Sequence, residues 1–107
     1  MRRLIGAALL AGALVAGCGG GDGAAKDAAL AAAREAYEQA RAEGVDLRNG
    51  PSIADPIEAM PDWVVDIAHD PRAAVDDDPA NQCASYRSGD SGHFVELDPE
   101  GNFIRAK

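Results

Sequence analysis

Large apolar side chains are distributed unevenly along this chain of 107 residues, and their distribution limits what the chain can fold into. Between residues 18 and 44, only Leu30 and Tyr37 are large and apolar. The others after residue 18 are Val45, Leu47, Ile53, Ile57, Met60, Trp63, Val64, Val65, Ile67, Val75, Tyr86, Phe94, Val95, Leu97, Phe103 and Ile104. A chain of this length supports one domain with a modest core. We therefore expect a small domain over residues 44–107, with the Ala-rich segment docked on it or projecting from it.

The first 17 residues have the composition of an export signal. Met1-Arg2-Arg3 is basic, and Leu4–Ala16 is an uncharged run of Leu, Ala, Val, Ile and Gly. A helix of this length reaches about 20 Å, which is shorter than the roughly 30 Å hydrocarbon core of a bilayer. The segment is therefore expected to be a cleaved signal peptide, residues 1–17, rather than a membrane span.

The end of this run, Leu14-Val15-Ala16-Gly17-Cys18, resembles the lipobox of bacterial prolipoproteins. That pattern has an aliphatic residue three before the cysteine, a small one two before it, and Gly or Ala directly before it. The resemblance, which covers only about the first eighteen residues, implies a diacylglycerol on the Cys18 sulfur and cleavage before Cys18. Two acyl chains anchor a protein stably. We expect a location on the extracytoplasmic face of the cell membrane, or in the outer membrane of an organism that has one.

The excess of acidic over basic residues limits the kinds of partner that the protein can bind. The net charge is −8, and loss of Arg2 and Arg3 with the signal leaves 8 basic against 18 acidic residues, or about −10. This disfavours nucleic-acid binding, which depends on Lys and Arg, and adhesion of the protein surface to anionic lipid. The expected partners are the membrane, through the lipid on Cys18, and an envelope protein. If Cys18 carries the lipid, Cys83 has no partner for an internal disulfide.

The segment after the cysteine divides into a tether and a helix. Residues 18–25 hold the lipidated cysteine and a Gly-rich flexible tether. Residues 26–43 predict an amphipathic Ala-rich helix, with Leu30, Ala33, Tyr37 and Ala40 on one face and Gly44 as its stop. This narrow stripe can dock on the domain, pair with another helix or belong to a stalk, and we favour docking.

Residues 44–107 predict a small acidic α+β domain. Its prolines and Asn49-Gly50 indicate that 45–62 is a loop with one short turn of helix near 56–60. Residues 63–68 predict a strand with Trp63, Val65 and Ile67 on one face. Residues 79–87 predict one short helix that begins after Asp78 as N-cap. Residues 93–97 and 102–105 predict a C-terminal β-hairpin around the turn at 98–101. The expected fold is the N-terminal helix plus a small antiparallel sheet with this hairpin and the short helix.

Four residues are candidates for chemistry. His69 and Asp70 follow a predicted strand, His93 begins another, and Cys83 is nearby in sequence. If the two strands pair, His69, Asp70 and His93 are candidate metal ligands, and Cys83 with a histidine is a candidate thiol–imidazole pair. No spacing is diagnostic. We favour structural roles for both histidines and a buried, inert Cys83.

The run 76–78 is acidic and, with Asp70 and Asn81, offers oxygen ligands suited to Ca²⁺. It lacks the alternation and central glycine of an EF-hand loop, so we favour a solvated loop whose last residue caps a helix.

The sequence contains no recognisable catalytic motif, and residues 61–105 resemble small domains of other bacterial exported proteins without implying an activity. The leading hypothesis is therefore a lipid-anchored, non-catalytic binding or structural module of the cell envelope, with no cofactor. The alternative is a small metal-binding or thiol/imidazole enzyme that uses His69, Asp70, Cys83 and His93. A third hypothesis is a protein that pairs through the helix at 26–43.

Overall fold

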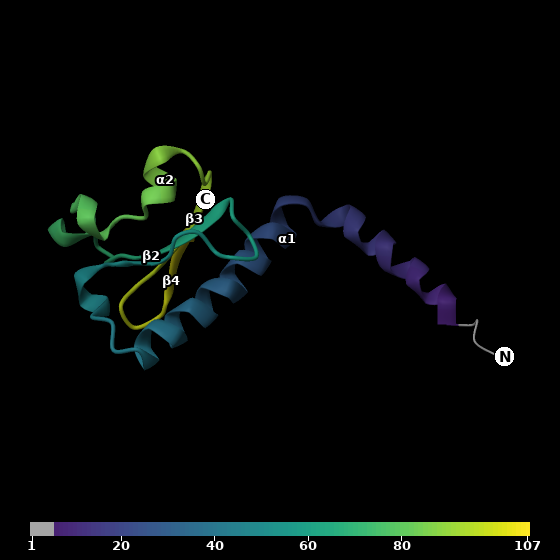
Figure 1. Ribbon diagram of the computed structural model, residues 1–107, viewed down its shortest axis with the longest axis horizontal. Coiled ribbons are helices and arrows are strands. Elements are labelled where there is room, and N and C mark those ends of the chain that lie inside the picture. Colours follow the sequence, from purple (N-terminus) through teal and green to yellow (C-terminus); the bar gives the residue numbers. More distant parts are fainter. Residues whose placement is uncertain (1–5) are drawn as a thin grey trace.

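The computed structural model describes residues 23–107 with their side chains. The predicted signal peptide and Cys18 lie outside these residues. The chain forms an α+β fold in which α1 (Gly6–Ala42), described here from Gly23 onward, packs against a four-stranded sheet. Figure 1 shows α1 along one side of the sheet, with α2 (Ala84–Ser88) on the opposite side. No helix in the described part of the chain is long and apolar enough to cross a membrane.

The Ala-rich stripe of α1 docks on the sheet, which confirms the favoured prediction for this helix. Ala29, Ala33, Tyr37 and Ala40 are buried in the core, and Leu30 is half-buried against it. Methyl groups on this face allow the helix backbone to approach the strands closely. Helix formation also extends further toward the N-terminus than predicted, because the last residues of the expected tether, 23–25, are helical.

The helix ends where glycine permits the required turn. Gly44 has a φ of +81°, in the left-handed region that favours glycine. The Gly44 amide donates to the Arg41 carbonyl and the Val45 amide donates to the Ala40 carbonyl. This pair of bonds is a Schellman motif, which satisfies the last carbonyl groups of the helix.

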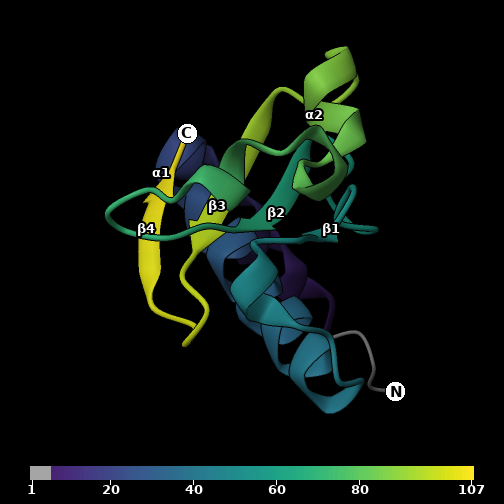
Figure 2. The same cartoon turned by 90° about the vertical axis from the view of Figure 1, so that its left-hand side faces the viewer.

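The sheet contains β1 (Ser52–Ala54), β2 (Trp63–Ile67), β3 (His93–Leu97) and β4 (Phe103–Ala106) in that spatial order. Figure 2 shows the four strands side by side in front of α1. β1 and β4 are antiparallel to their neighbours, whereas β2 and β3 are parallel.

The expectation of an antiparallel sheet is therefore wrong for its central pair, and the sheet is mixed. Parallel pairing needs a long crossover, which the chain between residues 68 and 92 supplies. Residues 56–60 form a non-helical turn closed by a β-bridge between Ile57 and Met60. The prediction of a loop with one short helical turn there is therefore also wrong for the segment 45–62. This segment contains β1 and the short 3₁₀ helix η1 (Leu47–Asn49), which the Asp46 side chain caps.

The crossover contains η2 (Ala74–Asp77), η3 (Pro79–Asn81) and α2. Asp78 caps η3 by accepting a hydrogen bond from the Ala80 amide, which confirms the predicted helix start. The continuous helix predicted over 79–87 is wrong, because the backbone is extended at Gln82 and Cys83. Two separate turns result, and Cys83 lies in the break between them.

A carboxylate from the β1 end of the sheet restarts the helix after this break. Asp55 accepts hydrogen bonds from the backbone amides of Ala84 and Ser85, at 2.8 and 2.9 Å. Burial acts to raise the pKa of Asp55, but the hydrogen bonds from Ser85 and Ala84 outweigh it and hold that pKa below its ordinary value. The cap is distant in sequence, so local patterns gave no sign of it.

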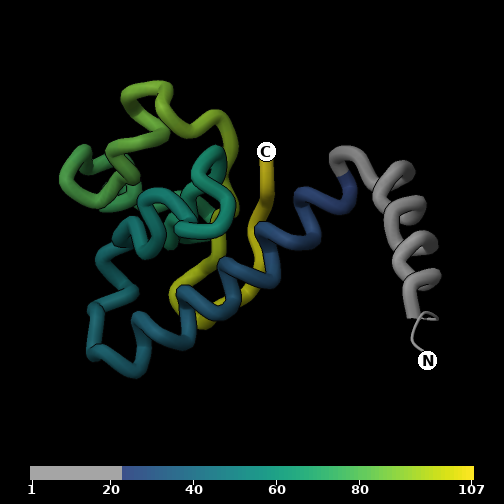
Figure 3. Tube along the Cα trace, turned by 45° about the vertical axis from the view of Figure 1, so that its right-hand side comes forward, coloured from purple at the N-terminus to yellow at the C-terminus, as the bar shows by residue number. Residues whose placement is uncertain are grey.

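The C-terminal hairpin forms as predicted. The Asp98 side chain accepts from the amides of Glu100 and Asn102, and Gly101 has a φ of +91°. Tyr37 of α1 donates its hydroxyl to the Pro99 carbonyl at 2.9 Å. Figure 3 shows this turn beside the described part of α1. The hairpin is thus bound to the helix as well as to β3.

Candidate ligand-binding site

The sheet register aligns polar residues on the face that α1 does not cover. Asp66 of β2 pairs with Glu96 of β3, Glu96 pairs with Arg105 of β4, and Asp66 also pairs with Ser52 of β1. Paired positions in neighbouring strands present side chains on the same face. The strands thus place four polar residues, here named the polar row, across the whole sheet.

Glu96 is the buried ionic centre of this row, with 6% of its surface exposed. Its carboxylate accepts a hydrogen bond from Arg105 Nε at 2.8 Å and lies 3.5 Å from Arg72 Nη1. Arg72 comes from the crossover and also binds Asp77 at 2.9 Å. Two guanidinium groups therefore compensate the charge of Glu96 from two sides.

Asp66 lies beside Glu96 but has no comparable partner. Its Oδ1 atom is buried and accepts no hydrogen bond from any residue in the described part of the chain. Burial, followed by repulsion from the neighbouring Glu96 carboxylate, raises the pKa of Asp66 to about 8. Asp66 is therefore mostly a neutral carboxylic acid at pH 7, with a proton available to donate.

A cavity of about 410 Å³ opens over this part of the sheet, a volume typical of small-molecule sites. We name it the arginine pocket. Its lining residues are Val64, Asp66, Arg72, Gln82, Cys83, Tyr86, Arg87, Phe94, Glu96 and Arg105. Three of the six arginines after residue 22 therefore line one cavity in a chain whose net charge is −8.

Aromatic side chains supply the apolar part of this pocket. Tyr86 and Phe94 meet edge to face with ring centroids 5.2 Å apart, and the Arg105 guanidinium lies 5.8 Å from the Phe94 centroid. Tyr86 is 42% exposed, so part of its side chain is accessible from solvent. The pocket thus combines cationic, carboxyl and aromatic groups.

Cys83 lies at the inner side of the pocket and is buried. Its Sγ contacts Ser52 Oγ and donates to the Val65 carbonyl at 3.4 Å. Burial raises the pKa of the thiol to about 12, so it stays protonated at neutral pH. The thiolate is the reactive form of cysteine, so this environment fits the predicted inert, buried thiol.

The two histidines do not converge. His69 follows the end of β2 whereas His93 begins β3, and these strands are parallel with Trp63 opposite His93. About 15 Å of strand therefore separates the two positions. The alternative hypothesis, in which His69, Asp70 and His93 converge, requires a strand end to meet a strand start, as it does in an antiparallel pair.

Each candidate has local contacts instead. His69 Nδ1 lies 2.9 Å from Asp76 Oδ1, His93 stacks on Trp63 with centroids 4.6 Å apart, and Asp70 is exposed. His93 Nε2 also lies 3.3 Å from an Asp62 oxygen. Among residues 23–107, no group of three or more His, Cys, Asp or Glu side chains is arranged to hold a metal ion.

The three aspartates of the acidic run 76–78 each bind a different group. Asp76 is 1% exposed and accepts from the amides of His69 and Ala73, at 2.8 and 2.9 Å. Burial acts to raise its pKa, but the bonds from Ala73 and His69 outweigh it and lower the pKa. Asp77 binds Arg72, and Asp78 caps η3. These contacts support a structural loop rather than a calcium site.

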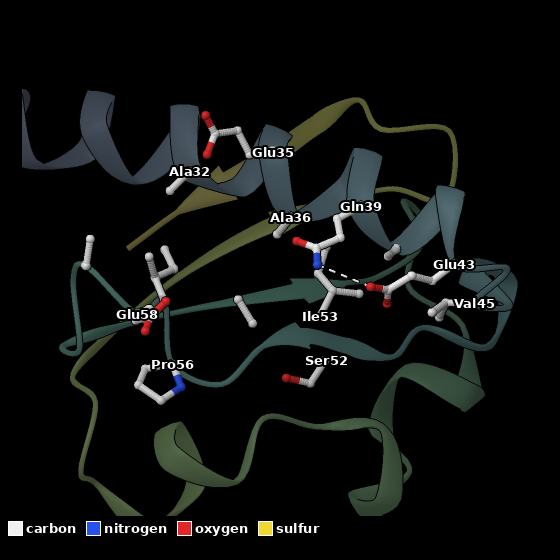
Figure 4. A pocket seen from close by; sticks show the side chains of 14 residues that line it. Ala32, Glu35, Ala36, Gln39, Glu43, Val45, Ser52, Ile53, Pro56 and Glu58 are labelled. Atoms are coloured by element: carbon white, nitrogen blue, oxygen red, sulfur yellow. Dashed lines mark hydrogen bonds between the residues drawn. The ribbon is translucent and has the colours of Figure 1, made fainter.

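A second, larger cavity of about 740 Å³ lies between α1 and the β1 segment (Figure 4). We name it the acidic groove. Its charged lining residues are Glu35, Glu43 and Glu58, and no basic side chain lines it. Figure 4 shows Glu58 and Glu43 toward opposite ends, with Gln39 bonded to Glu43. This groove is open and lacks a buried polar group that would orient a ligand.

Sequence reasoning did not single out Asp66, Glu96 or the three pocket arginines. One signal was present. Both central strands carry a single carboxylate at their fourth position, between apolar neighbours, in Trp63–Ile67 and His93–Leu97. A charged residue inside an apolar strand requires an explanation, but only the parallel register places the two carboxyl groups side by side.

No family model, curated protein or solved structure matches this chain.

Proposed function

We propose that this chain is a lipid-anchored module of the cell envelope that binds a small ligand without transforming it, and that the arginine pocket is its binding site. The main support for this site is that three arginines and two carboxyl groups line one cavity. They are Arg72, Arg87, Arg105, Asp66 and Glu96. The domain is otherwise acidic, so this concentration of arginine is local.

The buried charged groups of the arginine pocket contribute little to the stability of the fold, and this supports a functional role for them. A buried ion pair contributes little net stability compared with apolar residues of similar volume. An unpartnered buried oxygen, such as Asp66 Oδ1, is unfavourable. Departures of this kind from simple packing concentrate at functional sites.

Binding is favoured over the alternative of a thiol/imidazole or metal enzyme. Cys83 is the nucleophile nearest the pocket, and its thiol is buried and protonated. His69 and His93 are absent from the pocket lining and occupy opposite ends of the β2–β3 pair. The described residues therefore offer no thiol–imidazole pair with which to activate a substrate there.

The membrane anchor rests on the lipobox at 14–18, and its test is direct. Cys18→Ser should yield an unprocessed precursor without lipid mass, whereas the parent chain is cleaved and diacylated. Intact mass spectrometry and labelling with a fatty acid measure both properties. Cys83→Ala is the matched control, and it should be processed and lipidated normally. A Cys18→Ser product of mature size and normal membrane attachment would exclude the anchor.

The site is tested by locating binding on the lipidated chain. We expect ligands found in a screen of small water-soluble metabolites to shift the backbone NMR signals of Tyr86, Phe94 and Glu96. Ligands that shift only Ile53 and Ala36, in the acidic groove, would contradict this assignment.

A further inference from the structure

The arginine pocket has more positive charge than its own carboxyl groups balance. Arg72 is paired with Asp77 at the rim, and Glu96 balances one further charge. Asp66 is largely neutral at pH 7 because burial and Glu96 raise its pKa. Of the three arginine charges, one is therefore left without an acidic counterpart.

The hydrogen bonds of the three arginine side chains show which of them can bind a ligand. Arg72 uses all three side-chain nitrogens, on Asp77, Glu96 and the Asp76 carbonyl. Arg105 is bonded to Glu96 through Nε, which leaves its two terminal nitrogens for another acceptor. Within residues 23–107, the Arg87 side chain makes no hydrogen bond or ion pair, although it lines the pocket.

The apolar walls limit the kind of anion that fits. Val64, Tyr86 and Phe94 line the same cavity as these arginines, and the Tyr86 and Phe94 rings meet edge to face. A small hydrated inorganic ion would leave this surface uncovered. A ligand with an aromatic or aliphatic portion would cover it and remove apolar area from water.

We propose that the ligand of the arginine pocket is a small amphipathic monoanion, a carboxylate whose aromatic or aliphatic portion packs on Tyr86 and Phe94 while Arg87 and Arg105 bind its charge. This inference rests on the proposed function, because it names the ligand class of the same site. Asp66 lines the same cavity beside Glu96, and its carboxyl group, when protonated, can donate a hydrogen bond to the bound carboxylate. Carboxylate recognition by guanidinium groups is strong because their geometries match.

Three water-soluble probes separate the parts of this inference. Phenylacetate carries both features, phenylacetamide lacks the charge, and acetate lacks the apolar portion. With the lipidated full chain in nonionic detergent, phenylacetate should shift the NMR signals of Tyr86 and Phe94. It should also bind about tenfold more tightly than phenylacetamide, as expected for one charge-assisted contact. It should bind about tenfold more tightly than acetate as well, because acetate has no aromatic ring to bury on Tyr86 and Phe94.

Arg87→Gln should weaken phenylacetate binding about tenfold and leave phenylacetamide binding unchanged. Arg34→Gln, on the exposed side of α1, removes the same charge far from the pocket lining and should change neither. Equal weakening by both variants would mean that overall charge, rather than the pocket, governs binding, and would overturn the inference.

Two further outcomes separate this inference from the function on which it rests. If phenylacetamide binds in the pocket as tightly as phenylacetate, the monoanion class is wrong while the pocket remains the binding site. If neither these probes nor the metabolite screen shifts any pocket signal, the proposed binding function itself fails.

Discussion

The two faces of the sheet are built from the same strands, but one is apolar and the other combines charged, polar and aromatic side chains. On the α1 face, Val65, Ile67, Val95 and Leu97 are fully buried, and Ala33 of the helix packs with them in one apolar cluster. The opposite face carries the polar row and the arginine pocket. Because side chains alternate along a strand, one five-residue strand contributes to both faces.

The α1 face of the sheet stabilises this small domain, whereas the opposite face is available for binding. The α1 face buries apolar area, which is the main favourable term in folding. The pocket face places charges where they gain little stability and leaves an open cavity. A chain with a modest core can maintain such a face only if the other face is well packed.

The two cavities make a second comparison. The acidic groove is the larger, yet its three glutamates are all exposed, whereas the arginine pocket contains the buried Glu96. Exposed charges are screened and interact weakly. The smaller cavity is therefore the better candidate for specific recognition.

The largest expected effect is on the α1 face. Ala33→Glu places a charge at a position with no exposure, and we expect a loss of about 3–5 kcal/mol, enough to unfold a marginal domain. Urea denaturation followed by tryptophan fluorescence from Trp63 measures it. Ala31→Glu, on the exposed side of the same helix, should change stability little. Similar values for the two variants would mean that α1 is not docked as described.

An intermediate effect is expected from the structural carboxylate next to the pocket face. Asp76→Asn puts an amide group among three donors, from the His69 amide, the His69 ring and the Ala73 amide. We expect a loss of about 2–4 kcal/mol. Asp77→Asn, at an exposed ion pair, should cost no more than about 1 kcal/mol. Calorimetric unfolding at pH 7 compares them, and equal costs would contradict the structural role of Asp76.

The effect of Asp66 is smaller and has the opposite sign. Its folded-state pKa is about 8, whereas an aspartate in the unfolded chain titrates near pH 3.9. Between these values the folded state holds the extra proton, so this group lowers stability progressively as pH rises from about 4 to about 8. Asp66→Asn removes that titration and should stabilise the domain by about 1–3 kcal/mol above pH 8, with allowance for partial exposure.

Urea unfolding of the parent chain and of Asp66→Asn at pH 5, 7 and 9 measures this difference. The gain should grow with pH. Asp90→Asn, at an exposed site, should follow the parent chain at all three values. A gain that is the same at pH 5 and pH 9 would show that Asp66 does not titrate in this range.

Local elements with strong short-range signals were predictable. The helix over 26–43, the hairpin around the turn at 98–101, and the Asp78 cap depend on residues within a few positions of one another. The break at Gln82 and Cys83 was not predictable in this way. It depends on Asp55, which caps α2 from a position 29 residues earlier in the chain.

The sequence by itself determined where the helix, the central strands and the turns form, because periodicity and turn chemistry act over a few residues. Tertiary structure alone decided that β2 and β3 run parallel, because a crossover of this length permits either direction. That choice separates His69 from His93 and sets Asp66 beside Glu96, with Arg72 and Arg105 around them. The candidate site exists only through pairing between distant segments, so the order of residues along the chain does not show that these residues lie together.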